Sequence, residues 1–412
     1  MFFPAAFFRE IWINHPYRCL FLLALFPRLL ALLFLSETIG QEHLEIAQSL
    51  LTGKGFVYEH EYPSTYLAPF YIYFLYLFLK FFSDPGNILL IKMIQIVLSA
   101  LLAPILLFLG EGIFDRKVGW LAAIIFLLHP LFIALPSTLV IDAFLIPWLY
   151  SLVFLIVFWR SSWNWIKALA LGVLSGIALL TKMRSLAFLL PLWGWMLVQP
   201  IKRVGGLNIP LFFLMIVTCL LVIAPWSIRN YQITGSFNLE HNFGYNFWMG
   251  SNLKANGLGK YSATETRFPR PPDLVEKLNR ADNDFERDGI FLKEGARFWR
   301  SHPWQGVRLT IKKIALFWWI DTVNPKTQSA LYWFPALIIS LSALAGLFYP
   351  GLKWKGIGGV LLGILGFHYL SVVMTFYIAR LRLSIEPVLF LYAAAFWMQI
   401  IQKGKERLTS CP

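Results

Sequence analysis

The chain has 412 residues, of which 58% are hydrophobic, 17% aromatic and only 14% charged. This apolar content and a mean hydropathy of +0.62 exclude an ordinary soluble domain and predict a polytopic membrane protein. The net charge of +14 does not indicate nucleic-acid binding, because the Lys and Arg residues stand in short clusters between apolar segments, as topology signals do. The three cysteines, Cys19, Cys219 and Cys411, are far apart, so we expect no disulfide and no cysteine-based metal site.

Ten apolar segments are long enough to cross a bilayer. They lie at about 19–36, 87–110, 118–135, 142–159, 167–182, 185–200, 208–226, 330–349, 357–378 and 386–401. Basic clusters lie at 116–117, 160–167, 202–203, 353–355 and 403–407, and we expect them on the cytoplasmic side. The first segment lacks a small-residue cleavage site before it and is expected to remain as an anchor. The pattern predicts a multi-pass membrane protein. The sequence has no Asn-x-Ser/Thr sequon, which fits a bacterial source, so we expect a bacterial inner membrane.

The segment 66–83 is apolar but does not fit as a further span. With the N-terminus and the cluster at 116–117 both cytoplasmic, only two crossings separate them, and 19–36 and 87–110 supply both. Nine of the 17 residues from Tyr66 to Phe82 are aromatic and four are tyrosines, a composition typical of the membrane interface. We therefore expect 66–83 to lie along the outer surface; an eleventh span with one basic cluster on the unexpected side is the alternative.

This topology divides the chain into three parts and places several loops on the outer side. The parts are a transmembrane module at 1–226, an outer loop domain at 227–326 and C-terminal transmembrane helices at 327–412. The outer segments are 37–86, 135–142, the turn 181–185, the long loop at about 227–326, and 378–386. The long loop contains a helical pattern from about 273 to 299 and is expected to form a small cap over the membrane face.

Four cations stand at the predicted outer boundary, where membrane topology disfavours them. They are Lys182, Arg184, Arg380 and Arg382. An anion at the headgroup level would explain this placement, and a phosphate or diphosphate suits it, with Arg as a bidentate donor and Lys as a point charge. The alternatives are contacts with lipid headgroups, or ion pairs with Asp142 or Glu386.

The first outer loop begins with carboxylates beside a membrane span. Glu37 and Glu42 precede a glycine turn at 52–56 and the aromatic run that starts at Tyr62. Carboxylates placed just outside a span, next to an aromatic surface, suit proton transfer at the lipid–water boundary. We interpret 37–86 as an active-site loop, with solvated helix-cap acidity as the alternative for either Glu.

Eight segments in chain order resemble one family. They read EIAQSLLTGKGF, YPSTYLAPFYIYFLYLF, HPLFIALPSTLVIDAF, LLTKMRSLAFLLP, APWSIRNYQITGSF, NFGYNFWMGSN, FWRSHPWQGVRLTIKKIALFWW and YIARLRLSIEPVLFLYAAA. The order looks like the bacterial branch of the GT-C superfamily of glycosyltransferases, similar to protein O-mannosyltransferases and lipid A aminoarabinose transferases. The resemblance implies an all-α GT-C fold with about ten transmembrane helices, juxtamembrane helices at about 43–52 and 69–82, and a small outer domain.

The resemblance also implies a reaction. Such enzymes take a sugar from a polyprenyl-phosphate donor and transfer it with inversion to an acceptor on the outer face, using an acidic residue of the first outer loop as base. Asp142 falls where the family often has a second acidic residue, and Lys182 matches its Lys or Arg after "LT". If His43 takes the place of the family's aromatic residue, Ile39 occupies the usual Asp position. Either Glu42 or Glu37 then serves as the base, or this copy is impaired.

Other polar and aromatic residues are candidates for substrate binding. They are His43, His60, Tyr71, Tyr245, Asn246 and Trp248. The last three are also consistent with ordinary packing of the outer loop. No ligand spacing indicates a metal, and no permanently bound cofactor is expected. The expected partners are membrane lipids, a polyprenyl-phosphate sugar, and a glycan, lipid or protein acceptor, but no nucleic acid. A transporter or flippase of lipid-linked sugars and a catalytically silent GT-C-like subunit are the alternative functions.

Overall fold

The computed structural model of the chain describes residues 15–34, 41–59, 62–198, 209–262, 267–318, 325–348 and 356–409. The described residues form α-helices and short 3-10 turns, and their only β pairings are two isolated bridges, Val57 with Pro63 and Leu258 with Tyr377. Glu37 and His60 lie outside the described residues.

Each of the ten predicted spans overlaps helix within the described residues. In the described part of the chain, six helical spans are long and apolar enough to cross a membrane. They are α2 (Pro16–Phe34), the pair α5 (Gly86–Ala100) and α6 (Leu102–Ile113), α9 (Ile141–Phe158), α12 (Ile209–Thr234), α17 (Ala330–Leu347) and α18 (Ile357–Met374). The predicted spans at 167–182 and 185–200 are the shorter apolar helices α10 (Trp165–Thr181) and α11 (Leu186–Val198), and the last is α20 (Glu386–Thr409).

A seventh span is counted if a bent pair of helices is treated as one crossing. This pair consists of α7 (Arg116–Leu128) and the segment Pro130–Ser137, which contains α8 (Pro130–Ala134) and η1 (Leu135–Ser137), and it bends by 65°. The bend follows from the sequence His129-Pro130, because proline disfavours helical geometry in the residue before it. His129 accordingly has an extended ψ of 116° and is buried at the break.

The predicted juxtamembrane helices of the first loop are present as α3 (Gln41–Leu51) and α4 (Phe70–Phe81). They pack against each other, and α4 also packs against α5. At 1.5 Å per residue the 12 residues of α4 reach about 18 Å, well short of the roughly 30 Å hydrocarbon core. The length of α4 thus agrees with a helix that lies along the membrane surface.

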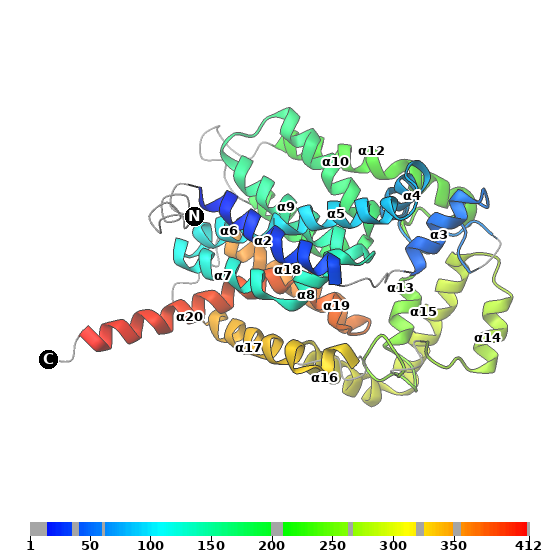
Figure 1. Ribbon diagram of the computed structural model, residues 1–412. Helices are drawn as coiled ribbons and strands as arrows, with labels where there is room; N and C mark the ends of the chain where they lie inside the picture. Colours follow the sequence, from blue (N-terminus) through cyan, green and yellow to red (C-terminus); the bar gives the residue numbers. More distant parts are fainter. Residues whose placement is uncertain are drawn as a thin grey trace.

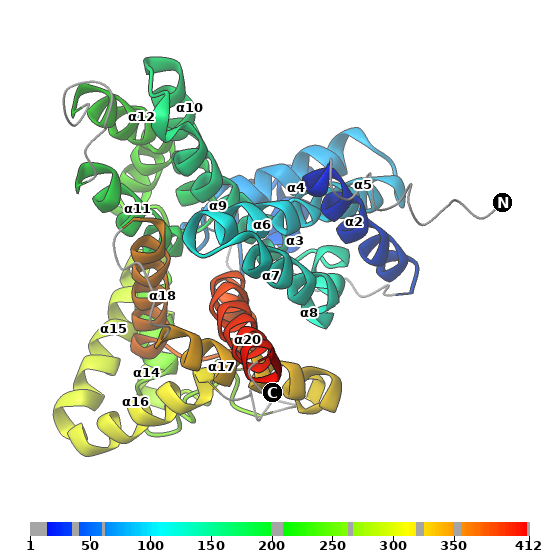
Figure 2. The ribbon, with the colours of Figure 1, turned by 90° about the vertical axis from the view of Figure 1, so that its left-hand side faces the viewer.

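The helices pack closely around α20. Viewed along the bundle, α20 lies between α7 and α17, and it packs against both (Figure 2). The hairpin of α10 and α12 packs through small residues. A Cβ on Gly172 would lie 2.5 Å from the carbonyl oxygen of Met215, so only glycine permits this approach.

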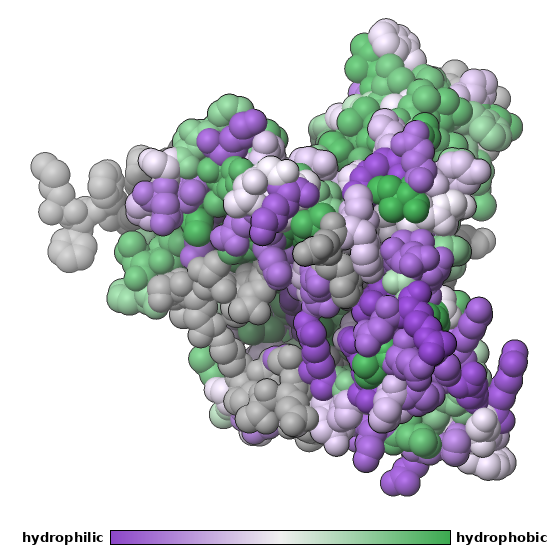
Figure 3. Space-filling model, turned by 90° about the vertical axis from the view of Figure 1, so that its right-hand side faces the viewer, coloured by the Kyte–Doolittle hydropathy of each residue, from purple (hydrophilic) through white to green (hydrophobic). Residues whose placement is uncertain are grey.

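The outer loop forms a helical layer at one end of the bundle. It contains α13 (Phe243–Met249), α14 (Pro272–Asn279), α15 (Asp284–Ser301) and α16 (Pro303–Trp318). Helices α13, α14 and α15 lie at the same end as α3, opposite the C-terminal end of α20 (Figure 1). Seen from that end, hydrophilic side chains gather over the lower part of the face, where α14 and α15 lie in Figure 1 (Figure 3).

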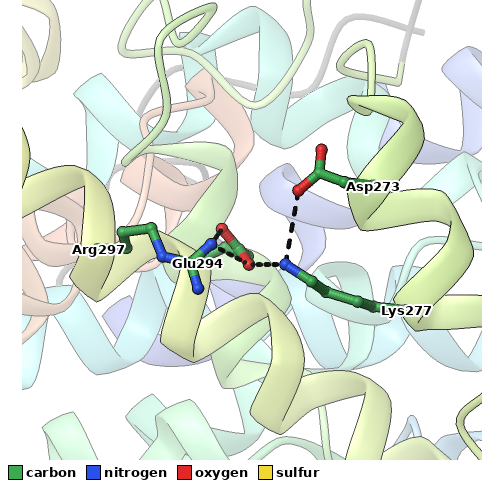
Figure 4. Close-up of polar contacts among 4 residues, drawn as sticks. All are labelled: Asp273, Lys277, Glu294 and Arg297. Atoms are coloured by element: carbon green, nitrogen blue, oxygen red, sulfur yellow. Dashed lines mark hydrogen bonds and ion pairs between the residues drawn. The ribbon is translucent and has the colours of Figure 1, made fainter.

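Two helix boundaries differ from the sequence prediction. The span predicted to end at 226 continues to Thr234, because the polar residues that follow, among them Arg229 and Asn230, are compatible with helix once they leave the membrane. The predicted pattern 273–299 is two helices, since Asn283 caps α15 by accepting from the Glu286 backbone N–H. Ion pairs that converge on Glu294 join the two helices (Figure 4).

Side-chain and backbone bonds attach this layer to the rest of the chain. At the start of α15, the Asp284 carboxylate accepts from the Ser64 hydroxyl and the Thr65 backbone N–H, each at 2.7 Å. Tyr377 donates its N–H to the Gly257 carbonyl at 3.0 Å, and the Gly259 N–H donates to the Tyr377 carbonyl at 3.0 Å. The outer layer is thereby bonded both to the first loop and to the segment that precedes Arg380.

Candidate active site

Three of the predicted outer turns meet in one pocket. The turns are those at the start of α9, between α10 and α11, and at α19 (Ala379–Leu383). The pocket is lined by Asp142, Leu145, Leu149, Lys182, Arg184, Ser185, Phe188, His368, Leu381 and Ser384. The lining runs from Asp142 to Ser384, so residues far apart in the sequence meet here through the tertiary fold.

Asp142 and Arg380 form the ion pair at this pocket. Asp142 lies in the first turn of α9 after the extended residue Val140, and its carboxylate is almost fully buried. Arg380 Nε lies 3.0 Å from Asp142 Oδ2, while 42% of the Arg380 side chain remains exposed. The pair therefore presents a partly solvated guanidinium at the edge of a buried carboxylate.

Lys182 and Arg184 approach the same carboxylate from the turn after α10. Lys182 ends the helix in an extended conformation, and the 3-10 turn η3 (Met183–Ser185) follows. The Ser185 hydroxyl donates to the Ala178 carbonyl at 2.9 Å, which ties the turn back to α10. Arg184 is only partly exposed, and its Nη1 is buried with no hydrogen-bond partner among the described residues. Such an unpaired donor is available to an anion.

Glu240 was not singled out from the sequence. Its carboxylate accepts from the Met183 backbone N–H at 3.3 Å, so it borders the turn that carries Lys182 and Arg184. Burial raises the pKa of the Glu240 carboxyl, although the nearby Lys182 acts in the opposite direction. One sequence signal existed: Glu240 is the only acidic residue between Asp142 and Glu265.

The first loop brings α3 to this group of charges. Glu42 is exposed in the first turn of α3, and the neighbouring His43 lies edge-on to the Tyr71 ring at 5.6 Å. Burial, together with the charges of Lys182 and Arg380, lowers the pKa of His43 to about 3. His43 is therefore a neutral imidazole at neutral pH and adds no positive charge to that of Lys182 and Arg380.

Several predicted substrate residues lie in packed positions. Tyr71 is fully buried and donates its hydroxyl to Gln95 at 2.8 Å. Trp248 is 3% exposed and packs against Phe291 at 5.2 Å between ring centres. The Asn246 side chain donates to Asn242. The structure therefore gives these residues packing or local bonding roles, whereas the partly exposed Tyr245 lies in an aromatic cluster on the outer side.

The structure does not bring Arg382 to the pocket. Arg382 is fully buried, donates to the carbonyls of Phe317 and Ala336, and its Nε lies 3.2 Å from Glu386 Oε1. The other oxygen of Glu386 lies 3.2 Å from His129 Nε2. Residues two apart in a helical turn face different sides, so Arg380 and Arg382 cannot serve one anion from α19. For Arg380 and Arg382, the alternative of pairing with Asp142 and Glu386 is what the structure shows.

No group of three or more His, Cys, Asp or Glu side chains gathers in a metal-binding arrangement within the described ranges.

Comparisons with known proteins extend this description. The sequence profile of a family described as dolichyl-phosphate-mannose-protein mannosyltransferase matches residues 66–228. A search of curated protein sequences found no significant match. The structure is similar to the archaeal oligosaccharyltransferase AglB from Archaeoglobus fulgidus in complex with an inhibitory peptide and a dolichol-phosphate, with 13% identity and a TM-score of 0.55 over 95% of this chain and 51% of that one.

Two further structures are similar to different degrees. The apo form of the Archaeoglobus fulgidus oligosaccharyltransferase matches with 11% identity and a TM-score of 0.55, again over 95% of this chain and 51% of that one. ArnT from Cupriavidus metallidurans bound to undecaprenyl phosphate matches with 12% identity and a TM-score of 0.42, over 93% of this chain and 78% of that one. The chain spans about half the length of the oligosaccharyltransferases that it resembles.

The described residues form an all-helical, multi-pass membrane fold similar to that of the archaeal oligosaccharyltransferase AglB. The family profile covers less than half of the chain, and the similarity to the archaeal oligosaccharyltransferase is one of fold.

Proposed function

We propose that the chain is a membrane glycosyltransferase that takes a sugar from a polyprenyl-phosphate donor and transfers it, with inversion, to an acceptor at the outer face of a bacterial inner membrane. The observation that carries the proposal is the pocket in which Lys182 and Arg184 approach the Asp142–Arg380 pair. The family profile and the dolichol-phosphate bound to the similar AglB structure support a lipid-linked donor.

In this proposal the cations bind the donor phosphate. The free Nη1 of Arg184, the exposed part of Arg380 and the Lys182 ammonium would surround one anion. Hydrogen bonds to a charged acceptor are the stronger kind, and they gain strength as charge accumulates on the leaving phosphate. Because the pocket lies where α9 begins and α10 ends, the polyprenyl tail would extend between membrane helices while the phosphate stays at this end of them.

A first-loop carboxylate would be the general base. As the acceptor oxygen or nitrogen attacks the anomeric carbon, the base takes the acceptor proton, and the bond between that carbon and the phosphate oxygen breaks. The electron pair of the broken bond stays on the phosphate, where Lys182, Arg184 and Arg380 neutralise it. Exposed Glu42 at the start of α3 is the described candidate, and Glu37 is the other. Asp142, held by Arg380, would orient the acceptor or the base.

A transfer assay tests the proposal directly. The purified full chain in lipid vesicles is given a radiolabelled pool of polyprenyl-phosphate sugars and membrane-extract acceptors. We expect label to move from the lipid to an acceptor, and Glu42→Gln or Glu37→Gln to reduce that transfer. Movement of labelled lipid across the vesicle membrane without transfer would instead establish a transporter, and binding of the lipid with neither activity would establish a silent subunit.

A further inference from the structure

A cluster of tyrosines lies beside the proposed active site and is not used by the mechanism above. Tyr58 and Tyr66, both from the first loop, stack with ring centres 5.5 Å apart and planes at 18°. Tyr66 lies 6.5 Å from Tyr245 of α13, whose ring also contacts Phe291 of α15 at 5.0 Å. Tyr58, Tyr66 and Tyr245 are each partly exposed, so the row of rings retains accessible surface.

Two arginines from the segment before α14 reach this row, but only one of them is neutralised. Arg267 forms an ion pair with Glu59. The guanidinium of Arg270 lies over the rings of Tyr245, at 5.8 Å, and Phe291, at 5.3 Å. Within the described ranges Arg270 forms no ion pair. Its charge is therefore available to a ligand that lies against the rings.

The loop that carries Tyr58 and Tyr66 is held in place on both sides. Glu59 has a φ of 56°, a left-handed conformation that costs free energy in a residue other than glycine. The ion pair with Arg267 holds Glu59 in this conformation. On the other side, the Asp284 carboxylate accepts from Ser64 and Thr65, the two residues that precede Tyr66. A loop that is fixed against the outer layer in this way presents its tyrosine rings without the ordering cost of a flexible loop.

Two members of the cluster, Tyr58 and Tyr66, belong to the first loop, which also carries α3. Burial raises the pKa of Tyr58 and of Tyr66, and the charge of Glu42 is the next cause in both cases. Glu42 is thus near the tyrosines, while the adjacent His43 is near Lys182 and Arg380. The candidate base Glu42 is therefore carried by the same loop as Tyr58 and Tyr66, as expected of a group that activates an acceptor bound to them.

We propose that Tyr58, Tyr66, Tyr245 and Arg270 form the acceptor subsite and that it binds a saccharide bearing a carboxylate or phosphate group. Tyrosine rings offer flat apolar faces with a polar edge, which match the C–H face and the hydroxyl rim of a sugar ring. The planar guanidinium of Arg270 matches a carboxylate or phosphate in two-point geometry. The inference rests on the proposed glycosyltransferase function, because it assigns the second substrate of that reaction.

The test is ligand binding to the full chain in detergent, followed by saturation-transfer NMR. The probes are methyl β-D-glucuronide and glucose 6-phosphate as anionic sugars and methyl β-D-glucoside as the neutral control. We expect the anionic probes to bind more tightly than the neutral one. Arg270→Gln should weaken the anionic probes about tenfold, in line with the loss of a charge-assisted bond, and leave the neutral probe unchanged. Arg270→Lys should restore part of the affinity.

Two controls separate this inference from its alternatives. Arg280→Gln removes an exposed cation of α14 and should leave all probes unaffected. Undecaprenyl phosphate, titrated in the same samples, should bind wild type and Arg270→Gln alike. Three results would overturn the acceptor subsite. The anionic probes could bind wild type and Arg270→Gln equally well, they could fail to bind the wild type, or undecaprenyl phosphate could displace them. If the wild type does not bind undecaprenyl phosphate at all, the proposed function itself is refuted.

Discussion

Arg184 lines the pocket and Arg380 pairs with Asp142 beside it, but removal of the two arginines should have different consequences. Arg184 has a buried Nη1 without a partner in the described structure, so Arg184→Ala removes a donor that only the ligand uses. The loss of one charge-assisted bond is worth about 1.5–3 kcal/mol, or roughly a 10- to 150-fold decrease in affinity for the donor phosphate. Arg184→Lys should recover only part of this, because an ammonium cannot reproduce the planar fork.

Arg380→Ala should also reduce folded stability. It leaves the carboxylate of Asp142, which is 1% exposed, without the guanidinium 3.0 Å away. Breaking a fully buried pair costs about 3–5 kcal/mol, but the Arg380 side chain is 42% exposed, so screening by water lowers our expectation to about 1–3 kcal/mol. Adding Asp142→Asn should restore most of that stability, since an amide needs no counter-charge, and should not restore donor affinity.

The assay combines two measurements on purified, monodisperse variants: the dissociation constant for undecaprenyl phosphate and the free energy of unfolding. Arg116→Ala is the matched control, because Arg116 also pairs with a glutamate, Glu111, but outside the pocket. If folded Arg184→Ala and Arg380→Ala bind the donor as tightly as the wild type, and the corresponding Lys variants behave like the wild type, then these side chains contact lipid headgroups. The phosphate site would then be wrong.

Three further outcomes follow from the structure. Glu42→Gln should lower turnover by roughly 10²–10⁴-fold with little change in donor affinity, and full activity in this variant, in Glu37→Gln and in the double variant would rule out a first-loop base. Glu386→Gln should lower the free energy of unfolding, measured by detergent titration, by about 3–5 kcal/mol, because Arg382 would remain buried and charged. A decrease below about 1 kcal/mol would contradict a buried charged pair. Burial raises the pKa of Glu240, so above the usual pKa of a glutamate the folded chain retains a proton that the unfolded chain has lost. The free energy of unfolding should therefore fall as the pH rises through this range. Glu240→Gln should flatten this pH dependence, which unfolding measured at several pH values tests.

The membrane helices could be predicted from the sequence because hydrophobic length is a local property. Each of the ten predicted spans overlaps helix within the described residues, and 43–52 and 69–82 correspond to α3 and α4. Two helix boundaries were predicted incorrectly because no change in hydrophobicity marks them in the sequence. The helix α12 continues past the apolar segment to Thr234, and the cap at Asn283 interrupts a pattern that looked continuous.

The site could be predicted only in part. Cations placed against the topology rule did identify Lys182, Arg184 and Arg380, which meet at Asp142. The same rule wrongly grouped Arg382 with them, because charge placement along the chain does not say which side of a short helix a residue faces. Glu240 was missed because its proximity to the 181–185 turn depends on how the loop after α12 folds back.

The bridge between Leu258 and Tyr377 has a consequence for how the two ends of the site respond to each other. Tyr377 exchanges backbone bonds with Gly257 and Gly259, and Lys313 donates to the Thr375 carbonyl at 3.0 Å. Arg380 follows three residues after Tyr377, so a displacement of the outer layer pulls on the guanidinium beside Asp142. A ligand that orders the outer layer and a lipid that orders Arg380 would then each change the other's affinity by the same factor, since such coupling is reciprocal.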